Sequence, residues 1–306
     1  MAKTAFLFAG QGSQSLGMAH DLYEIYPIVQ ETFHQASHVL GYDVRQLIDK
    51  DEKKLNQTRY TQPAILATSV AIYRLLLEKG IAPDMVAGLS LGEYSALVAS
   101  GALEFEKAIA LVAKRGQYME VAAPYGSGKM VAVLDTPVDI IEEACEKATE
   151  KGVVSLANYN TPTQIVIGGE VAAVDKAVDY LKVAGAKRLI PLKVSGPFHT
   201  ALLKSASDKL AKELETVTFD TFKLPLIGNT KATVMQESEI KTLLARQVME
   251  PVHFYESINT MLSLGMTDVI EIGPGKVLTG FLKKIDKTIP SISVYDKVSL
   301  ENLLAR

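Results

Sequence analysis

Short apolar runs alternate with longer helical stretches along this chain, and that alternation limits the folds open to it. The runs TAFLFAG at 4–10 and MVAGLS at 85–90 have the length and apolar content of buried strands. Apolar residues then recur with helical spacing at 17–40, at 63–79 and beyond residue 91. Strands that alternate with helices are typical of βαβ units. We therefore predict an α/β fold whose main sheet is mostly parallel.

A different order of elements follows the Pro/Gly-rich break PYGSGK at 124–129. The segment 124–196 reads as a strand, a helix, two strands joined by a turn at NTP, a helix and a strand. This β-α-β-β-α-β order is that of a small ferredoxin-like unit. Because the α/β pattern resumes after GPFH, we predict a small domain at 124–196 inserted into a large domain made of 1–123 and 197–306.

Composition narrows the class of protein. The net charge of -3 argues against bulk attraction to nucleic acid, and the single cysteine, Cys145, allows no intrachain disulfide. The most apolar later stretch, 64–77, is interrupted by Arg74 and is too short to span a bilayer. Cysteines and histidines lack the spacing of a metal site. We expect a cytoplasmic protein that binds no metal, nucleic acid or membrane.

The strongest chemical motif is GLSLG at 88–92, which has the pattern G-x-S-x-G between a predicted strand and a predicted helix. Gly88 and Gly92 permit a tight turn that exposes the hydroxyl of Ser90. The backbone N–H of Leu91 points the same way and can bind a developing oxyanion. The alternative is a Gly-rich turn in which Ser90 only caps the helix. We favour a nucleophilic serine.

A serine nucleophile needs a base, and the chain has five histidines. His20, His34 and His38 lie among polar residues of a helical region, and His253 begins a helix as a surface or packing residue. His199 lies in the loop SGPFHT between the insert and the next helix, where catalytic groups usually sit. His199 is therefore the candidate base, with a structural role as the open alternative.

Arg115 falls on the apolar stripe of the predicted helix at 104–122, whereas Lys114 lies off it. A guanidinium that faces a core needs an anionic partner to offset its desolvation. That partner is either an internal carboxylate or one that arrives with a substrate, and a third alternative is an arginine that reaches solvent from a helix end. We favour a carboxylate on the substrate, which arginine can bind through two parallel hydrogen bonds.

Several motifs now form an ordered set that reaches EIGPGKVL at 271–278 and covers nearly the whole chain. They are GQGSQ (10–14), GLSLGEYSAL (88–97), KRGQYM (114–119), NYNTPTQIVIGG (158–169), GPFHT (196–200) and QVMEPV (247–252). In this order they resemble the malonyl-CoA:acyl carrier protein transacylase family of fatty acid synthesis. The resemblance implies a large α/β-hydrolase-like domain with a mostly parallel sheet and an inserted ferredoxin-like domain.

The resemblance also implies a ping-pong transfer of malonyl from malonyl-CoA to the phosphopantetheine thiol of acyl carrier protein, through an ester on Ser90. It implies these further roles: His199 as general base, the backbone amides of Gln11 and Leu91 as the oxyanion hole, Arg115 as holder of the malonyl carboxylate, and Gln247 as the residue whose backbone carbonyl orients His199. One departure is Leu89, where the family often has histidine. Phe198 is similar to the pattern of malonyl-selective members.

The partners implied are acyl carrier protein and coenzyme A, with no metal or redox cofactor, and we expect a monomer. An acidic carrier needs a basic surface, and the candidates are Lys187, Arg188, Lys193, Lys276, Lys283 and Lys284. Two other functions stay open. A serine esterase or thioesterase would use the same turn with water as acceptor, although such enzymes usually place histidine near the C-terminus. In a binding module without catalytic activity, the turn at 88–92 would have a structural role only.

Overall fold

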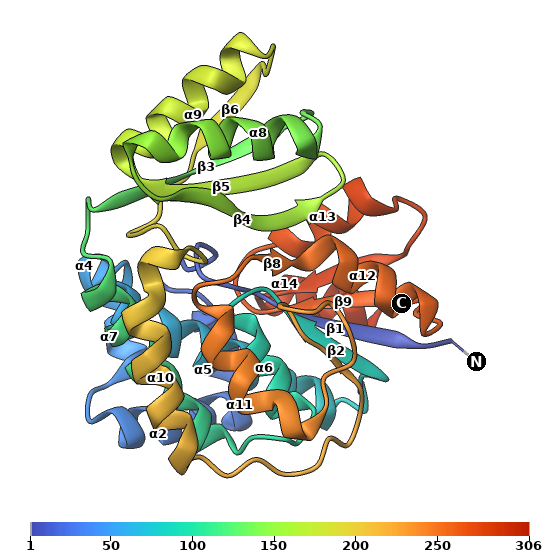
Figure 1. The fold of residues 1–306 in the computed structure, drawn as a ribbon. Helices are drawn as coiled ribbons and strands as arrows, with labels where there is room; N and C mark the ends of the chain where they lie inside the picture. Colours follow the sequence, from blue (N-terminus) through green and yellow to red (C-terminus); the bar gives the residue numbers. More distant parts are fainter. Residues whose placement is uncertain (1, 306) are drawn as a thin grey trace.

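The structure, a computed structural model, describes residues 2–305 and contains two five-stranded sheets (Figure 1). Every strand pair of the first, sheet A, is parallel, which confirms the predicted α/β class. Its strand order is β10-β9-β1-β2-β7. The strands are β1 (Thr4–Phe8), β2 (Met85–Gly88), β7 (Leu226–Ile227), β9 (Asp268–Ile272) and β10 (Ser291–Val294).

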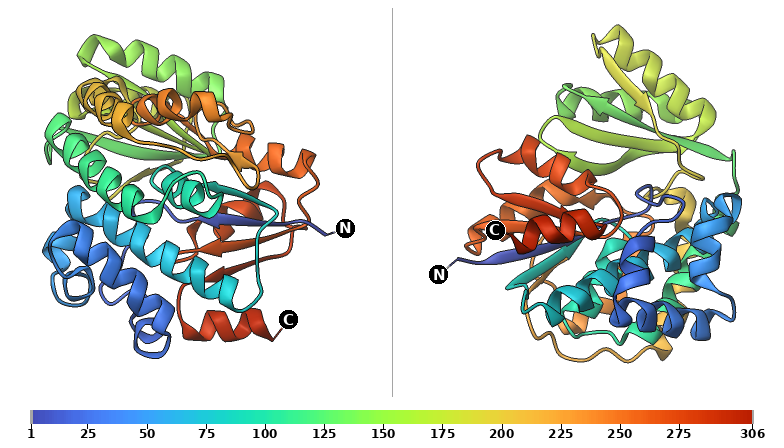
Figure 2. Two further views of the ribbon diagram at one scale, coloured as in Figure 1. Left: turned by 90° about the horizontal axis from the view of Figure 1, so that it is seen from below. Right: turned by 180° about the vertical axis from the view of Figure 1, so that it is seen from behind.

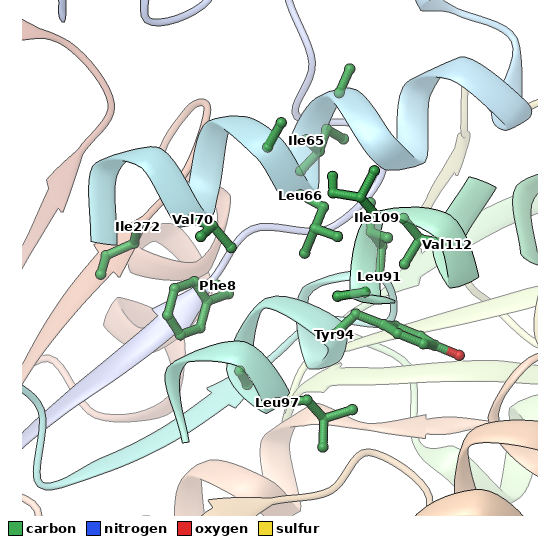
Figure 3. Packing of buried hydrophobic residues seen from close by; sticks show 14 of the residues in the cluster. Phe8, Ile65, Leu66, Val70, Leu91, Tyr94, Leu97, Ile109, Val112 and Ile272 are labelled. Atoms are coloured by element: carbon green, nitrogen blue, oxygen red, sulfur yellow. The ribbon is translucent and has the colours of Figure 1, made fainter. Parts of the chain in front are cut away.

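Both faces of sheet A are buried. Phe6 and Phe8 of β1 point to one face, and Ala5 and Leu7 point to the other. The first face packs on α2 (Pro27–Leu40), α5 (Thr58–Glu78), α6 (Gly92–Ala99) and α7 (Phe105–Ala122), part of which Figure 3 shows. The second face packs on α12 (Phe254–Ser263) and α13 (Val277–Ile285). Two covered faces explain why these strands read as continuous apolar runs.

We call the part of the molecule built around sheet A the large part. Its remaining helices complete its outer layer. They are α1 (His20–Ile25), α3 (Val44–Lys50), α4 (Glu52–Leu55), α10 (Lys204–Thr216), α11 (Ile240–Gln247), α14 (Lys297–Leu304), and the short turns η2 (Ala201–Leu203) and η3 (Glu237–Glu239). The helix expected at 17–40 is interrupted at Tyr26, because Pro27 lacks a backbone N–H and starts a new helix at its first position. Helix α5 starts at Thr58, five residues before the expected start at Pro63.

The second sheet, sheet B, has the strand order β6-β3-β5-β4-β8. Its elements between residues 128 and 191 follow the predicted β-α-β-β-α-β order. They are β3 (Gly128–Leu134), α8 (Val138–Ala148), η1 (Thr149–Lys151), β4 (Val154–Thr161), β5 (Gln164–Glu170), α9 (Val171–Val183) and β6 (Arg188–Pro191). The fifth strand, β8 (Val252–His253), was not predicted; it comes from the C-terminal part and pairs in parallel with β4.

Sheet B packs over the carboxyl ends of the strands of sheet A (Figure 2). One face of sheet B is covered by α8 and α9, while Met130, Ala132 and Val166 on the other face join the core of the large part. Loops that follow parallel strands meet at one edge of a sheet, which is where α/β proteins usually bind ligands. Within residues 2–305, no helix combines the length and apolarity that a membrane crossing requires.

Candidate active site

Ser90 lies in the tight turn between β2 and α6, as the G-x-S-x-G motif predicts. Its φ of 53° is in the left-handed region, which is unfavourable for a residue with a side chain. A Cβ on Gly88 would lie 2.0 Å from the carbonyl carbon of Gly92. A Cβ on Gly92 would lie 2.1 Å from the carbonyl oxygen of Phe8. Strand and helix therefore approach so closely that only glycine fits on both sides of the serine.

Two amide side chains hold the backbone of Ser90 in this conformation. Its N–H donates to Oδ1 of Asn229 at 2.7 Å, and its carbonyl accepts from Nε2 of Gln247 at 3.0 Å. Asn229 follows β7, and its Nδ2 donates to the carbonyl of Gly88 at 2.7 Å. Strained backbone of this kind costs about 1–3 kcal/mol and persists only where neighbours enforce it. The fold thus fixes the serine hydroxyl in one direction.

His199 is the histidine that the fold places against Ser90, with Nε2 at 2.8 Å from the serine Oγ. Its Nδ1 lies 2.7 Å from the carbonyl of Gln247, which can only accept, so Nδ1 carries the proton and Nε2 is free to take one. Burial, with a contribution from the charge of Arg115, lowers the pKa of His199 to about 4. The imidazole is therefore neutral near pH 7. Of the other four, His20, His34 and His38 are exposed, and His253 stacks on Tyr159.

Arg115 is buried beneath Ser90, with 1% of its surface exposed, as its position on the apolar stripe predicts. Its Nη1 donates to Oε1 of Gln62 at 2.8 Å. Its Nη2 donates to Oε1 of Gln247 at 2.9 Å and to Oγ of Ser90 at 3.2 Å. Among residues 2–305 no carboxylate oxygen lies within 4.0 Å of its guanidinium. The internal ion pair that the sequence left open is therefore absent from the described part of the chain.

Gln11 and Leu91 are the two residues expected to supply the amides of the oxyanion hole. Gln11 follows β1 by a short loop, and Leu91 is the residue directly after Ser90. In the described part of the chain, neither backbone N–H donates a hydrogen bond to another protein group. The side chain of Gln11 is held by Thr58 at 3.1 Å and by Gln62 at 3.2 Å. Gln62 thus connects the Gln11 loop to Arg115.

A cavity of about 450 Å³ opens above Ser90 and His199, and Phe198 and Leu89 also line it. We call its two walls the large-sheet side, which carries Gln11, Leu89, Ser90, Phe198 and His199, and the small-sheet side, which carries Met130, Ala132, Val166, Ile190 and Leu192. The amides of Asn158, Asn160 and Gln164 lie along it. A hollow of about 290 Å³ shares Gln164, Val277 and Phe281 with this cavity and is lined by Arg188, Lys276 and Lys284.

Three residues of this network were missed by sequence reasoning: Asn229, Gln62 and Glu93. Glu93 is a fully buried carboxylate whose Oε2 accepts from Nε2 of Gln247 at 2.8 Å and from the backbone N–H of Asn229 at 3.0 Å. A charged residue three positions after the serine, in a helix that is otherwise uncharged, is a signal that could have found it. Asn229 and Gln62 lie far from Ser90 in sequence, and no spacing rule connects them.

No cluster of three or more histidine, cysteine, aspartate or glutamate side chains suited to a metal occurs among residues 2–305. The chemistry that the site offers is a neutral imidazole next to a serine hydroxyl, two free backbone amides and a buried cation. Fold and site together define an α/β enzyme of the acyltransferase class.

Comparison with known proteins supports the assignment to the acyltransferase class. A model of the acyl transferase domain matches residues 5–299. The "Malonyl CoA-acyl carrier protein transacylase" of Bacillus subtilis is 46% identical over 98% of this chain and 96% of its own length. A crystal structure of MCAT from Streptococcus pneumoniae is 70% identical over 99% of both chains, with a TM-score of 0.97. A malonyl-transacylase solved in complex with a type II PKS acyl-carrier protein is 45% identical, with a TM-score of 0.96, over 99% of both chains. The chain belongs to the malonyl-CoA:acyl carrier protein transacylase family of acyltransferases.

Proposed function

We propose that this chain transfers malonyl from malonyl-CoA to the phosphopantetheine thiol of acyl carrier protein, through an ester on Ser90. The observation that carries the proposal is the contact of Ser90 Oγ with both Nε2 of His199 at 2.8 Å and Nη2 of Arg115 at 3.2 Å. The hydroxyl of Ser90 thus contacts both the proposed base, His199, and a cation without a carboxylate partner, Arg115. The family relationship supports the same reaction.

In the first half-reaction, His199 accepts the proton of Ser90 while Oγ attacks the thioester carbonyl carbon. The C–S bond breaks, and the coenzyme A thiolate leaves with the proton that the imidazole then donates. In the second half, the carrier thiol gives its proton to His199, attacks the Ser90 ester and restores the hydroxyl. No oxidation state changes in either half, so the proposed reaction requires no redox cofactor, and we assign it none and no metal.

The backbone N–H groups of Gln11 and Leu91 are the oxyanion donors in this proposal. Three observations support this assignment: Gln11 lines the same cavity as Ser90, Leu91 directly follows Ser90, and neither N–H has a protein partner within residues 2–305. Donors that are already oriented stabilise the negative charge of the tetrahedral intermediate without reorganising. Gln247 has the supporting role: its backbone carbonyl holds Nδ1 of His199, and this bond keeps the reactive nitrogen toward the serine.

Arg115 is the proposed holder of the malonyl carboxylate. Its Nη1 uses one N–H for Gln62 and keeps a second, and one N–H of Nη2 points at Ser90 Oγ, the atom that would carry the acyl group. We propose that these two N–H groups, one on each terminal nitrogen, bind the carboxylate of the acyl group. Two parallel N–H groups match the two oxygens of a carboxylate. The carboxylate in turn supplies the negative charge that the buried guanidinium lacks.

The carrier is proposed to approach over the hollow next to the active-site cavity. Arg188, Lys276 and Lys284 line that hollow, and the other predicted cations, Lys187, Lys193 and Lys283, are exposed as well. Reversing the charge of Lys276 and Lys284 together should slow transfer to the carrier and weaken its salt dependence. Transfer from malonyl-CoA to a small thiol should be spared, and an equal loss in both assays would contradict docking at this surface.

We further propose that the large domain comprises 1–123 and 197–306, with 124–196 as the small domain, and that the protein works as a cytoplasmic monomer. The boundaries are supported by the position of β3 to β6, which all lie within the inserted segment and form four of the five strands of sheet B. Size-exclusion chromatography with light scattering would test the monomer.

The function is tested by intact-protein mass spectrometry after mixing with malonyl-CoA. We expect a malonyl-sized adduct on the parent that disappears when holo carrier protein is added, and no adduct on Ser90→Ala. An adduct that is lost as fast to water as to carrier would instead indicate a thioesterase. A parent protein that never forms an adduct would refute the proposal.

A further inference from the structure

Glu93 is the second charged group buried beneath the serine, and the reaction steps above do not use it. It lies in the first turn of α6, where the helix dipole favours a negative charge. Its side chain is fully buried, and no lysine, arginine or histidine nitrogen among residues 2–305 lies within 4.0 Å of it. Its Oε1 has no hydrogen-bond partner in that part of the chain. An ionised carboxylate that is buried without a cationic partner has an unfavourable desolvation free energy. This cost suggests that Glu93 has a function.

Gln247 connects Glu93 to Arg115. A carboxylate only accepts hydrogen bonds and a guanidinium only donates them. Nε2 of Gln247 therefore faces Oε2 of Glu93 at 2.8 Å, and its Oε1 faces Nη2 of Arg115 at 2.9 Å. The result is a line of charge, amide and opposite charge, in which each end polarises the amide between them. The charge of Glu93 thus acts on Arg115 without direct contact.

The charges of Glu93 and Arg115 also affect how tightly an acyl group on Ser90 is bound. Arg115 also contacts Oγ of Ser90, where the proposed ester forms. A malonyl carboxylate held by Arg115 would share that cation with Glu93. Two anions that share one buried cation repel each other and weaken each other's hold on it. An acetyl group carries no charge and would not compete.

We propose that Glu93 is the resident counter-charge of Arg115, a positioning residue that acts through Gln247 and limits how tightly the malonyl group is held on Ser90. This inference rests on the proposed function. The first half-reaction is Ser90–OH + malonyl-S-CoA ⇌ malonyl-O-Ser90 + CoA-SH. An enzyme that exchanges one thioester for another through this ester must release the malonyl group as readily as it accepts it. If Arg115 had no counter-charge of its own, the malonyl carboxylate would supply all of it, and the ester would accumulate.

The test is the equilibrium between free and acylated enzyme, measured by intact-protein mass spectrometry at fixed ratios of malonyl-CoA to coenzyme A at pH 8. Glu93→Gln keeps one oxygen that can accept from Gln247 and Asn229, removes the charge, and places an NH2 group where Oε1 has no partner. We expect it to shift the malonyl equilibrium toward the ester on the order of tenfold, the scale of coupling between nearby partly screened charges. The acetyl equilibrium should change by less than about twofold.

The matched control is Glu271→Gln. Glu271 is also fully buried, but it accepts from the backbone N–H groups of Leu278 and Thr279 at the start of α13 and from Oγ of Ser293. Its substitution should lower stability and leave the ratio of the two acyl equilibria unchanged. A malonyl ester fraction in Glu93→Gln that equals or falls below that of the parent would overturn the inference, while the parent adduct would still support the proposed function.

The parent protein supplies a second measurement that needs no variant. Burial raises the pKa of Glu93 to about 7, so acidification from pH 8 to pH 6 neutralises it in place. The ionisable groups facing this network are Arg115 on α7, Tyr94 on α6, with a pKa raised to about 12, and His199, with a pKa lowered to about 4. Burial lowers the pKa of Arg115, but a guanidinium stays protonated in proteins. Tyr94 and His199 do not change charge in that range. The parent's malonyl ester fraction should rise with acidification relative to acetyl, and a constant ratio would count against the role of Glu93.

Discussion

The two sides of the active-site cavity differ in what they are made of. Beneath the large-sheet side, polar groups hold one another in a single arrangement, from Ser90 and His199 down to Arg115 and Gln247. The small-sheet side presents Met130, Ala132, Val166, Ile190 and Leu192. Directional bonds fix the first wall, whereas the second is mostly apolar and carries polar groups in the amides of Asn158, Asn160 and Gln164. We infer that the chemistry depends on the large-sheet side and that the small-sheet side shapes the cavity and keeps water out.

The largest effect should come from His199. His199→Ala removes the proposed proton acceptor of Ser90, and acylation should slow by roughly 10²- to 10⁴-fold, the usual contribution of general base catalysis. Stopped-flow or quenched-flow measurement of the malonyl adduct checks this. A variant that is acylated at the parent rate would show that the 2.8 Å contact has no catalytic role.

Arg115→Ala should separate the two acyl groups. The variant would bury the malonyl carboxylate without its partner, at a cost of about 3 kcal/mol, or roughly a 150-fold loss in kcat/KM. Acetyl-CoA has no such charge and should lose little. The measurement is the ratio of kcat/KM for the two substrates in parent and variant. If both substrates lose the same factor, Arg115 is a structural residue of the large-sheet side.

A substitution on the small-sheet side should do much less. Val166→Ala removes two methyl groups from a strand that faces the cavity, and we expect a stability loss of about 1–2 kcal/mol. Malonyl transfer should stay within about fivefold of the parent, because no polar contact of the serine is touched. Thermal unfolding and steady-state rates give both values. A loss as large as that of His199→Ala would break the distinction between the two walls.

The smallest effect concerns pH. Because burial and Arg115 lower the pKa of His199 to about 4, the imidazole of His199 stays neutral on acidification until the pH approaches that value. Acetyl transfer, which involves no substrate carboxylate, should be nearly constant from pH 7 to pH 5 and fall to about half near pH 4. If the base were a solvent-exposed histidine, the transfer rate would instead fall to half near pH 6.5. The rate profile with acetyl-CoA distinguishes the two.

Much of this arrangement could be predicted from local sequence. The strand, serine and helix at 85–99 are encoded by neighbouring residues, and the burial of Arg115 follows from its position on a helical stripe. The contact of His199 with Ser90 could be proposed from residues but not placed, since 109 positions separate them. Glu93, Asn229 and Gln62 could not be assigned, because their partners are set by how β7, α5 and α11 pack, which no local pattern records.

Strand β8 limits how modular this protein is. It comes from residues 252–253, yet it closes the β4 edge of the small sheet, and the N–H of His253 donates to the carbonyl of Asn229 at 2.9 Å. A fragment of 124–196 alone would carry four of the five strands and leave β4 open to strands of other molecules. Swapping that segment between related enzymes would therefore transfer a sheet without its last strand. The unit that can be exchanged must include residues 252–253, and through Asn229 it is connected to the backbone of Ser90.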